Sequence, residues 1–219
     1  MCALVILGAL AADAHAHGVS SRDIAMMSEG GIVAFAYLGA KHMVTGYDHL
    51  LFLFGVIFFL YRLRDVATYV TLFAVGHSVT LLFGVLTGIR VDAFLIDAVI
   101  GLSVVYKALD NIGAFERVLG FRPDTKIMVL LFGFIHGFGL ATKLQEFTAG
   151  REGIVADILA FNVGVELGQL LALSAILIAM GFWRHRAGFL RHAFAANVVL
   201  MICGFILVGF QLTGFFIGA

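Results

Sequence analysis

Residues 154–181 read IVADILAFNVGVELGQLLALSAILIAMG, one long apolar block that contains a few polar side chains. An α-helix needs about 20 consecutive apolar residues to cross the hydrocarbon core of a bilayer, and this block has that length. Asn162, Glu166 and Gln169 follow one another at spacings of four and three, which places them on one face of a helix. The block therefore predicts a membrane-spanning helix whose polar stripe, with Gly164 and Gly168 beside it, faces the interior of a helix bundle.

The composition of the whole chain extends this prediction. Of the 219 residues, 62% are hydrophobic and 13% are charged, whereas soluble domains have about 45–50% apolar and about 25% charged residues. This much apolar surface requires lipid as part of the solvent. We therefore predict an all-α membrane protein, a bundle of about six transmembrane helices that occupies residues 46–219. The predicted spans are residues 46–61, 66–88, 92–112, 127–146, 154–181 and 193–217.

Two expectations about these spans follow from the sequence. The spans share no fixed sequence period, so we predict no internal repeat. The aromatic residues are mostly Phe, and we expect them to pack against lipid.

The N-terminal 45 residues are predicted to lie outside this domain. Residues 1–16 form a short apolar run ending in small residues, which predicts a signal segment cleaved after Ala14 or Ala16, although no Lys or Arg precedes Arg22. Residues 17–45 are predicted to face outward, with an interfacial or re-entrant helix over residues 31–45. A new N-terminus at His15 or His17 could bind copper or nickel, but we favour an ordinary signal-segment end.

The loops predict the orientation in the membrane, because cytoplasmic loops are enriched in Lys and Arg. The poorer side carries Arg22, Arg90 and Arg151, with Lys41 near it. We predict a protein of the bacterial inner membrane with both termini outside. A formal net charge of zero and the absence of a basic tract argue against a nucleic-acid partner. The richer, cytoplasmic side carries Arg62, Arg64, Arg117, Arg122, Lys126, Arg184, Arg186 and Arg191.

Ionisable side chains inside the predicted spans point to function, because each costs about 2.5–3.5 kcal/mol at the helix centre on insertion scales. His42, Asp48 and His49 form the first group, and a turn around Gly46 would fold His42 back towards the other two. Imidazole and carboxylate together suit divalent transition metals. The alternative for Asp48 is a helix N-cap.

Further candidates lie in the later spans. His77 and His136 are candidate ligands. The alternative for His77 is a hydrogen bond to a neighbouring backbone carbonyl. The alternative for His136 is that the glycines around it only allow close helix packing. Glu166 is the strongest carboxylate candidate, with a buried hydrogen-bond network as its alternative, whereas Lys107, Asp110 and Lys143 are expected to snorkel to the membrane surface. The predicted metal ligands are His42, Asp48, His49, His77, Asp97, His136 and Glu166, supported by Ser78, Asn111, Asn162 and Gln169.

In this order the motifs resemble the HupE/UreJ family, hydrogenase and urease accessory membrane proteins. The resemblance runs from about residue 31 to the end of the chain. It implies about six spans, often after a cleaved signal, and uptake of nickel, by extension cobalt, for metalloenzyme maturation. The motifs are His42-x5-Asp48-His49, Gly76-His77-Ser78-Val-Thr-Leu, Ala108-Leu-Asp-Asn111, Phe134-Ile-His136-Gly-Phe-Gly139 and Phe161-Asn-Val-Gly-Val-Glu166-Leu-Gly-Gln169.

One departure places the chain in a divergent second branch of that family. The better-studied branch carries a second histidine after the His-Gly element, whereas Phe138 and Gly139 follow His136-Gly137 here. The acidic residue would come from Glu166 or Glu146. Nickel specificity therefore stays open.

Two functions remain in competition. The first is a permease that moves a divalent metal, nickel or cobalt in preference to zinc, copper or iron, toward the cytoplasm. The second is an intramembrane metalloenzyme with a fixed His/carboxylate centre, which we favour less. A compact, well-supported site would favour the enzyme, and ligands spread along the membrane normal would favour transport. The expected partners are the lipid bilayer, the metal ion and a second copy of the chain.

Overall fold

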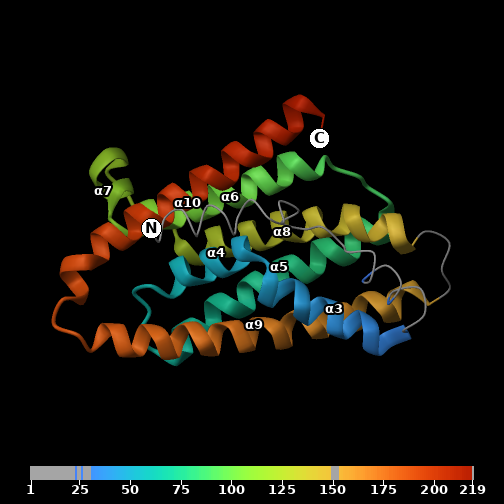
Figure 1. The fold of residues 1–219 in the computed structure, drawn as a ribbon, viewed down its shortest axis with the longest axis horizontal. Coiled ribbons are helices and arrows are strands. Elements are labelled where there is room, and N and C mark those ends of the chain that lie inside the picture. The colour runs from blue at the N-terminus through green and yellow to red at the C-terminus, as the bar shows by residue number, and fades with distance from the viewer. Residues whose placement is uncertain (1–22, 24–25, 27–30, 149–152, 219) are drawn as a thin grey trace, which may run out of the picture.

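The structure, a computed structural model, describes residues 23, 26, 31–148 and 153–218. Within these residues all regular structure is α-helical (Figure 1). The predicted signal segment, residues 1–16, and the metal-binding arm at His15 or His17 lie outside the described residues. The helices are α3 (Gly31–Thr45), α4 (Tyr47–Ile57), α5 (Leu63–Thr87), α6 (Ala93–Asn111), α7 (Ala114–Leu119), α8 (Thr125–Thr148), α9 (Ile154–Arg184) and α10 (Phe189–Ile217).

The all-helical prediction is confirmed for the part of the chain that is described. Four of its helices are long and apolar enough to cross a membrane: α5, α8 over Thr125–Thr142, α9 and α10. Large apolar side chains such as Leu171, Phe182 and Phe216 are exposed on their outer surfaces. Lipid is the solvent that suits such a surface, and the protein is a multi-pass membrane protein.

The structure corrects the extent of the first predicted span, residues 46–61, and confirms a helix over residues 31–45. The helix α4 has only 11 residues and is too short to span alone. It follows α3 directly, because only Gly46 separates them, with an extended ψ of 98°. The helix α3 packs lengthwise along α9. Together α3 and α4 form one helix that is broken at Gly46 (Figure 1).

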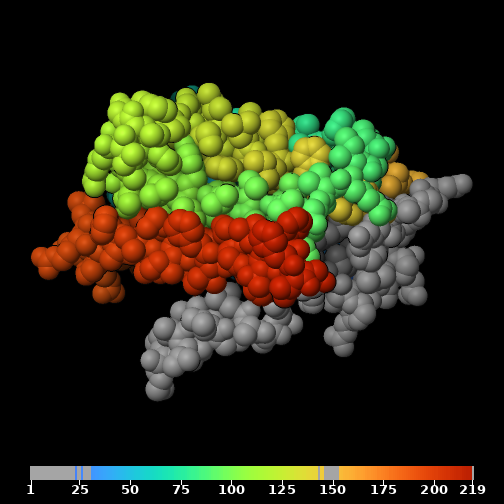
Figure 2. Space-filling view, turned by 90° about the horizontal axis from the view of Figure 1, so that it is seen from above, coloured from blue at the N-terminus to red at the C-terminus, as the bar shows by residue number. Residues whose placement is uncertain are grey.

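Three helix pairs carry the most extensive packing: α3 with α9, α5 with α8, and α6 with α10. Glycines bring the backbones of each pair into direct contact. A Cβ atom added to Gly164 of α9 would lie 1.8 Å from the carbonyl oxygen of Ala36 in α3. One added to Gly76 of α5 would lie 2.6 Å from the carbonyl oxygen of Leu130 in α8. Figure 2 shows α10 running along one face of the molecule beside α6 and α7.

In helix α6 the structure contradicts the prediction that Lys107 and Asp110 snorkel to the surface. Both side chains are buried, and Lys107 Nζ donates a hydrogen bond of 2.5 Å to Asp110 Oδ2. Arg122 Nε donates to the other carboxylate oxygen of Asp110 at 2.8 Å. The lysine therefore stays inside because its counter-ion lies one turn further along the same helix. The predicted snorkelling of Lys143 concerns a side chain outside the described ones.

Candidate metal centre

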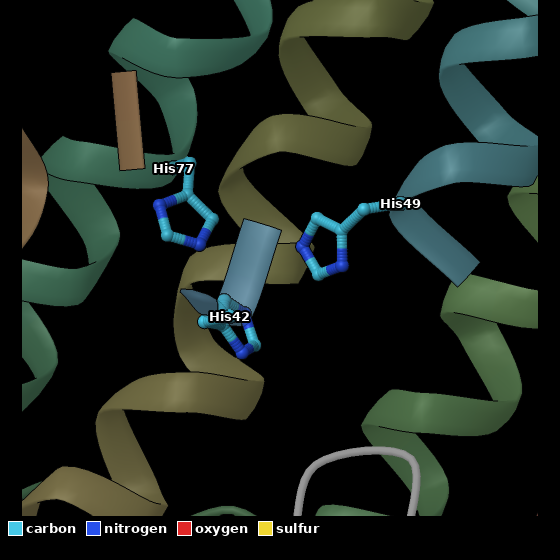
Figure 3. A group of neighbouring side chains, drawn as sticks. All are labelled: His42, His49 and His77. Carbon is cyan, nitrogen blue, oxygen red and sulfur yellow. The ribbon is translucent and has the colours of Figure 1, made fainter. Parts of the chain in front are cut away.

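Three imidazoles converge where the broken helix meets α5. Figure 3 shows His42 of α3, His49 of α4 and His77 of α5 pointing toward one another. One candidate ligand atom from each lies within 4.8 Å of the other two. His49 and His77 are each 1% exposed, and His42 is half-buried. The three side chains are close enough to share one ion.

A fourth imidazole, His136 of α8, completes this group. Its ring centroid lies 5.0 Å from that of His49, and the side chain is 2% exposed. Its Nε2 is 3.4 Å from the hydroxyl oxygen of Ser103 in α6. His42, His49, His77 and His136 therefore form one buried histidine cluster, to which four helices contribute one ring each.

Gly46 makes this arrangement sterically feasible. A Cβ atom at this position would lie 2.9 Å from the carbonyl oxygen of His42, 3.0 Å from Nδ1 of His49 and 3.1 Å from Oδ1 of Asp48. The break brings the ring centroids of His42 and His49 to 4.9 Å. The prediction that the chain folds back around Gly46 is confirmed.

Asp48 fixes the orientation of the His49 ring. Its Oδ1 lies 3.0 Å from Nδ1 of His49 and also accepts the backbone N–H of the same residue at 2.8 Å. A carboxylate can only accept, so Nδ1 carries the proton and a neutral ring keeps its lone pair on Nε2. This is the carboxylate–histidine arrangement that supports metal ligands in proteins. Asp48 also lies in the first turn of α4, where the helix dipole favours its charge.

The predicted polar stripe of α9 is only partly buried. Asn162 and Gln169 are buried, but Glu166 is exposed on the outer face of the helix. Residues seven apart lie almost two full turns apart and share a direction, whereas Glu166 is rotated by about 40° from Asn162. That rotation carries it past the edge of the buried face. A role for Glu166 as a ligand stays a prediction.

The remaining predicted residues have separate places. Asp97 is buried, and its Oδ1 would lie 3.5 Å from a Cβ added to Gly139, one turn beyond His136. Ser78 follows His77 in α5 and is half-buried. Asn111 donates to the carbonyl of Gly55 at 2.8 Å and to Asn197 at 2.9 Å, so it ties α6 to α4 and α10.

Three phenylalanines lie at one end of the histidine cluster. The sequence analysis expected phenylalanine side chains to pack against lipid, and these three do not. The ring centroid of Phe73 is 4.9 Å from that of His136, and the centroid of Phe52 is 5.6 Å from it. Phe52 also lies 5.8 Å from Phe132. All three are buried. We name Phe52, Phe73 and Phe132 the phenylalanine layer; their spacing of three or four residues from a histidine was the only signal in the sequence.

A pocket of about 490 Å³ lies beyond this layer, on the side of the basic loops. Val56 and Tyr69, each one helical turn from Phe52 or Phe73, contribute to its wall. Lys107 and Arg122 line it further out. The histidine cluster, the phenylalanine layer and the pocket therefore follow one another along the helices.

The donor set suits a borderline divalent cation. Imidazole nitrogens bind nickel, cobalt, zinc and copper, and magnesium and calcium prefer oxygen ligands. Imidazole binds a metal in its neutral form, so Asp48 beside the cluster would compensate only part of the charge of a divalent ion. Such a site can bind an ion without holding it as firmly as a set of thiolates would.

Comparisons with known proteins identify the family of the chain. None of the curated proteins and none of the solved structures gives a significant match to the chain. The family described as "HupE / UreJ protein" matches residues 20–219, which include helices α3 to α10 and the whole histidine cluster. The chain belongs to the HupE/UreJ family.

Proposed function

We propose that this protein is a permease that carries a divalent transition-metal ion, nickel or cobalt, into the cytoplasm for the maturation of metalloenzymes. Family membership supports an accessory role in metal supply. The observation that carries the proposal is the histidine cluster itself, buried between helices at a break in one of them. Broken helices inside a membrane are a recurrent way to build ion and substrate sites in transporters.

The proposed topology has six crossings. Four are the apolar helices α5, α8, α9 and α10. The fifth is α6, whose 19 residues extend for about 28 Å, close to the thickness of the hydrocarbon core. The sixth is the pair of half-helices α3 and α4, which share one crossing. The basic loops then face the cytoplasm and both ends of the mature chain face outward.

In this proposal the ion enters near His42 and is held by the histidine cluster. Asp48 holds His49 in its binding tautomer, and Asp97 lies further along the same core. Asn162 and Gln169 supply buried amide groups on α9. Neutral ligands can replace part of the water shell of the ion and still release it, as a conduction pathway requires.

The decisive experiment measures binding and uptake in the same variants. Purified protein in detergent is loaded with nickel, and bound metal is counted by elemental analysis. The same protein in liposomes is tested for nickel entry with an internal metal-sensitive dye. His49→Ala and His77→Ala should lose both bound nickel and uptake, because each removes a buried ligand. His185→Ala, which removes an exposed histidine from the end of α9, is the matched control and should retain both.

Unchanged uptake in both cluster variants would exclude the histidine cluster as the transport site. Elemental analysis also identifies the preferred ion, because nickel, cobalt, zinc and copper can be offered in competition.

A second candidate function, an intramembrane metalloenzyme, is favoured by one specific observation. The cluster is compact, and Asp48 supports His49 in the manner of a fixed metal centre. A cofactor would stay bound through extended dialysis, and liposomes would remain impermeable to the metal. Rapid exchange of bound nickel with nickel in solution, together with its entry into liposomes, would favour the permease.

A further inference from the structure

We propose that the membrane domain consists of two inverted copies of a three-helix unit, and that the metal ion crosses when two helix pairs rock against each other around the histidine cluster. The first unit is α3/α4, α5 and α6, and the second is α8, α9 and α10. The repeat stands on contacts within the fold, whereas its role in metal movement rests on the proposed transport function. The sequence was expected to contain no internal repeat.

The contacts within two helix pairs follow one correspondence. Gly164 of α9 lies against the carbonyl of Ala36 in α3, just as Gly76 of α5 lies against the carbonyl of Leu130 in α8. At the same offsets Gly39 of α3 lies against the carbonyl of Phe161, and Gly133 of α8 lies against the carbonyl of Phe73. The α3–α9 pair therefore matches the α8–α5 pair. In this match α3 corresponds to α8, the first helix of each unit, and α5 corresponds to α9, the second helix of each unit.

The correspondence continues through polar contacts and through the sequence itself. Gly168 lies against the carbonyl of Ala40, and Thr80 at the equivalent position donates to the carbonyl of Phe134 at 2.7 Å. Phe161-Asn-Val-Gly164 corresponds to Phe73-Ala-Val-Gly76, and Gly39-Ala-Lys-His42 corresponds to Gly133-Phe-Ile-His136. His42 and His136 are thus equivalent positions in the two units.

The third helices pair with each other, as a two-fold axis between the units requires. Gly101 of α6 packs against Val208 of α10, and Gly204 of α10 packs against Val105 of α6. These are reciprocal contacts: the helix pair maps onto itself when the two units are exchanged. The α6–α10 pair therefore lies on the axis.

The two units have opposite orientations. Ala36 lies against Gly164 and Ala40 lies against Gly168, so α3 and α9 are parallel. Phe73 lies against Gly133 and His77 lies against Gly137, so α5 and α8 are parallel too. The helices α8 and α9 run in opposite directions (Figure 1), so α3 is antiparallel to its counterpart α8. An inverted repeat of this kind has its axis in the membrane plane, and substrates of such transporters bind where the repeats meet.

The candidate metal centre follows the same symmetry in part, because His42 and His136 are equivalent, whereas His49 and His77 have no histidine at the equivalent positions, Lys143 and Val165. His42 and His49 come from the α3/α4–α9 pair, and His77 and His136 come from the α5–α8 pair. The ring of Phe161 lies 6.2 Å from His42, and its counterpart Phe73 lies 4.9 Å from His136, the residue equivalent to His42. Two closely packed pairs therefore contribute two imidazoles each to the cluster, with equivalent phenylalanines at its opposite ends.

The first helices of the two units, α3/α4 and α8, differ in one respect: one is broken and the other is continuous. We assign the two conformations of the transporter to this difference. The chain is broken at Gly46 after His42, but α8 continues as a helix through Leu140, the equivalent position after His136. In the structure the phenylalanine layer, to which α4 contributes Phe52, closes the route toward the 490 Å³ pocket. Exchange of the two conformations would break α8 near Gly137 and Gly139, open that layer and close the opposite end at Phe161.

Cross-linking tests the rocking step. In a chain with Cys2→Ser and Cys203→Ser, Phe52→Cys and Phe132→Cys are introduced together and bridged by a short bis-methanethiosulfonate, which joins the two thiols through reducible mixed disulfides and releases methanesulfinate. The bridge joins the two pairs through the phenylalanine layer. We expect nickel entry into liposomes to fall to the level of empty liposomes, while the amount of nickel bound by the protein is unchanged. Reductive removal of the bridge should restore entry, so each sample is its own control.

A matched bridge within one pair separates rocking from general rigidity. Gly101→Cys and Leu207→Cys join α6 to α10, where the two Cβ atoms would be 3.1 Å apart, and this bridge should leave nickel entry unchanged. If the first double variant fails to fold, Phe52→Cys with Phe73→Cys joins the same pairs, since those ring centroids lie 5.4 Å apart. Full nickel entry across a bridged layer, or loss of entry with the α6–α10 bridge, would overturn the proposal. Either result leaves the proposed permease intact, because that depends on the His49→Ala and His77→Ala measurements.

Discussion

Individual residues of the candidate metal centre divide into proposed metal ligands and residues that would support them. Asp48 belongs to the second group, because its carboxylate contacts the ring nitrogen of His49 that faces away from the lone pair used for metal. Supporting carboxylates of this kind keep a histidine in one tautomer and one orientation. The sequence grouped Asp48 with His42 and His49 as ligands, whereas the geometry favours Asp48 as a support for the His49 ring.

Asp48→Asn tests that supporting role. The amide keeps the size of the carboxylate but loses its charge, so we expect nickel affinity to fall by about 10–100-fold, the usual effect of losing such a partner. Nickel titration of the purified protein measures it. Asp92→Asn is the control, because Asp92 only caps α6 by accepting from the Leu95 N–H at 3.1 Å. An Asp48→Asn protein with the affinity of the unsubstituted chain would contradict the assignment.

The buried Lys107 makes a second prediction at this scale. Asp110→Asn would leave the ammonium without its main counter-ion, and breaking a buried pair in this way costs about 3–5 kcal/mol. We expect a large drop in the thermal unfolding temperature. Adding Lys107→Met to Asp110→Asn removes the uncompensated charge, so the double variant should recover much of that stability. A double variant no more stable than Asp110→Asn would exclude the ion pair as the cause.

The sequence predicted the four histidines of the cluster, because a histidine inside an apolar helix needs a polar partner and the partners on offer were few. It placed Glu166 on the buried face and Lys107 at the surface, and both were wrong. Helical spacing predicts which side of a helix a residue lies on, but it does not predict how wide the buried side is. That width depends on the helices packed against it. The counter-ion of Lys107 lies on the same helix, but nothing in the spacing alone separates a buried pair from two snorkelling side chains.

At the scale of helices, glycine contacts determine which elements pair. Gly164→Ala should be strongly destabilising, because the added methyl would lie 1.8 Å from a backbone oxygen that cannot rotate away. Overpacking of this kind costs about 1–3 kcal/mol or more. Gly181→Ala in the same helix is the control, because a Cβ there has no described atom within 4 Å. Thermal unfolding in detergent should rank Gly164→Ala well below Gly181→Ala, and equal stabilities would refute the close contact.

Hydropathy predicted the extents of α5, α6, α8, α9 and α10 to within a few residues, because length and apolarity determine a buried or lipid-facing helix. It also predicted α3, residues 31–45, but it extended α4 to residue 61, whereas this helix ends at Ile57. The stretch around Gly46 is too polar to look like a span and too apolar to look like a loop, so composition alone suggested an interfacial helix. Its packing along α9, which supports the proposed crossing, depends on pairs of glycines that are distant in the sequence.

The inverted repeat belongs to the whole molecule, and it illustrates the same limit. Its sequence trace is short, F-x-V-G in α5 and α9 and G-x-x-H in α3 and α8, and it lies in two separate pieces with different offsets. No single period connects them. Only the three-dimensional pairing of the helices shows that both pieces describe one symmetry operation.

The topology supplies the last prediction. The six proposed crossings place the two ends of the mature chain on one side, and the count of Lys and Arg predicts that this side is the outside. Alkaline phosphatase, which is active only outside the cytoplasm, should be active when fused after Ala219. The control is a fusion after Arg186, in the basic loop between α9 and α10, which should be inactive with phosphatase and fluorescent with green fluorescent protein. The opposite pattern of reporter activity would show that both ends face the cytoplasm. The pocket beyond the phenylalanine layer would then be the entrance for metal instead of the exit.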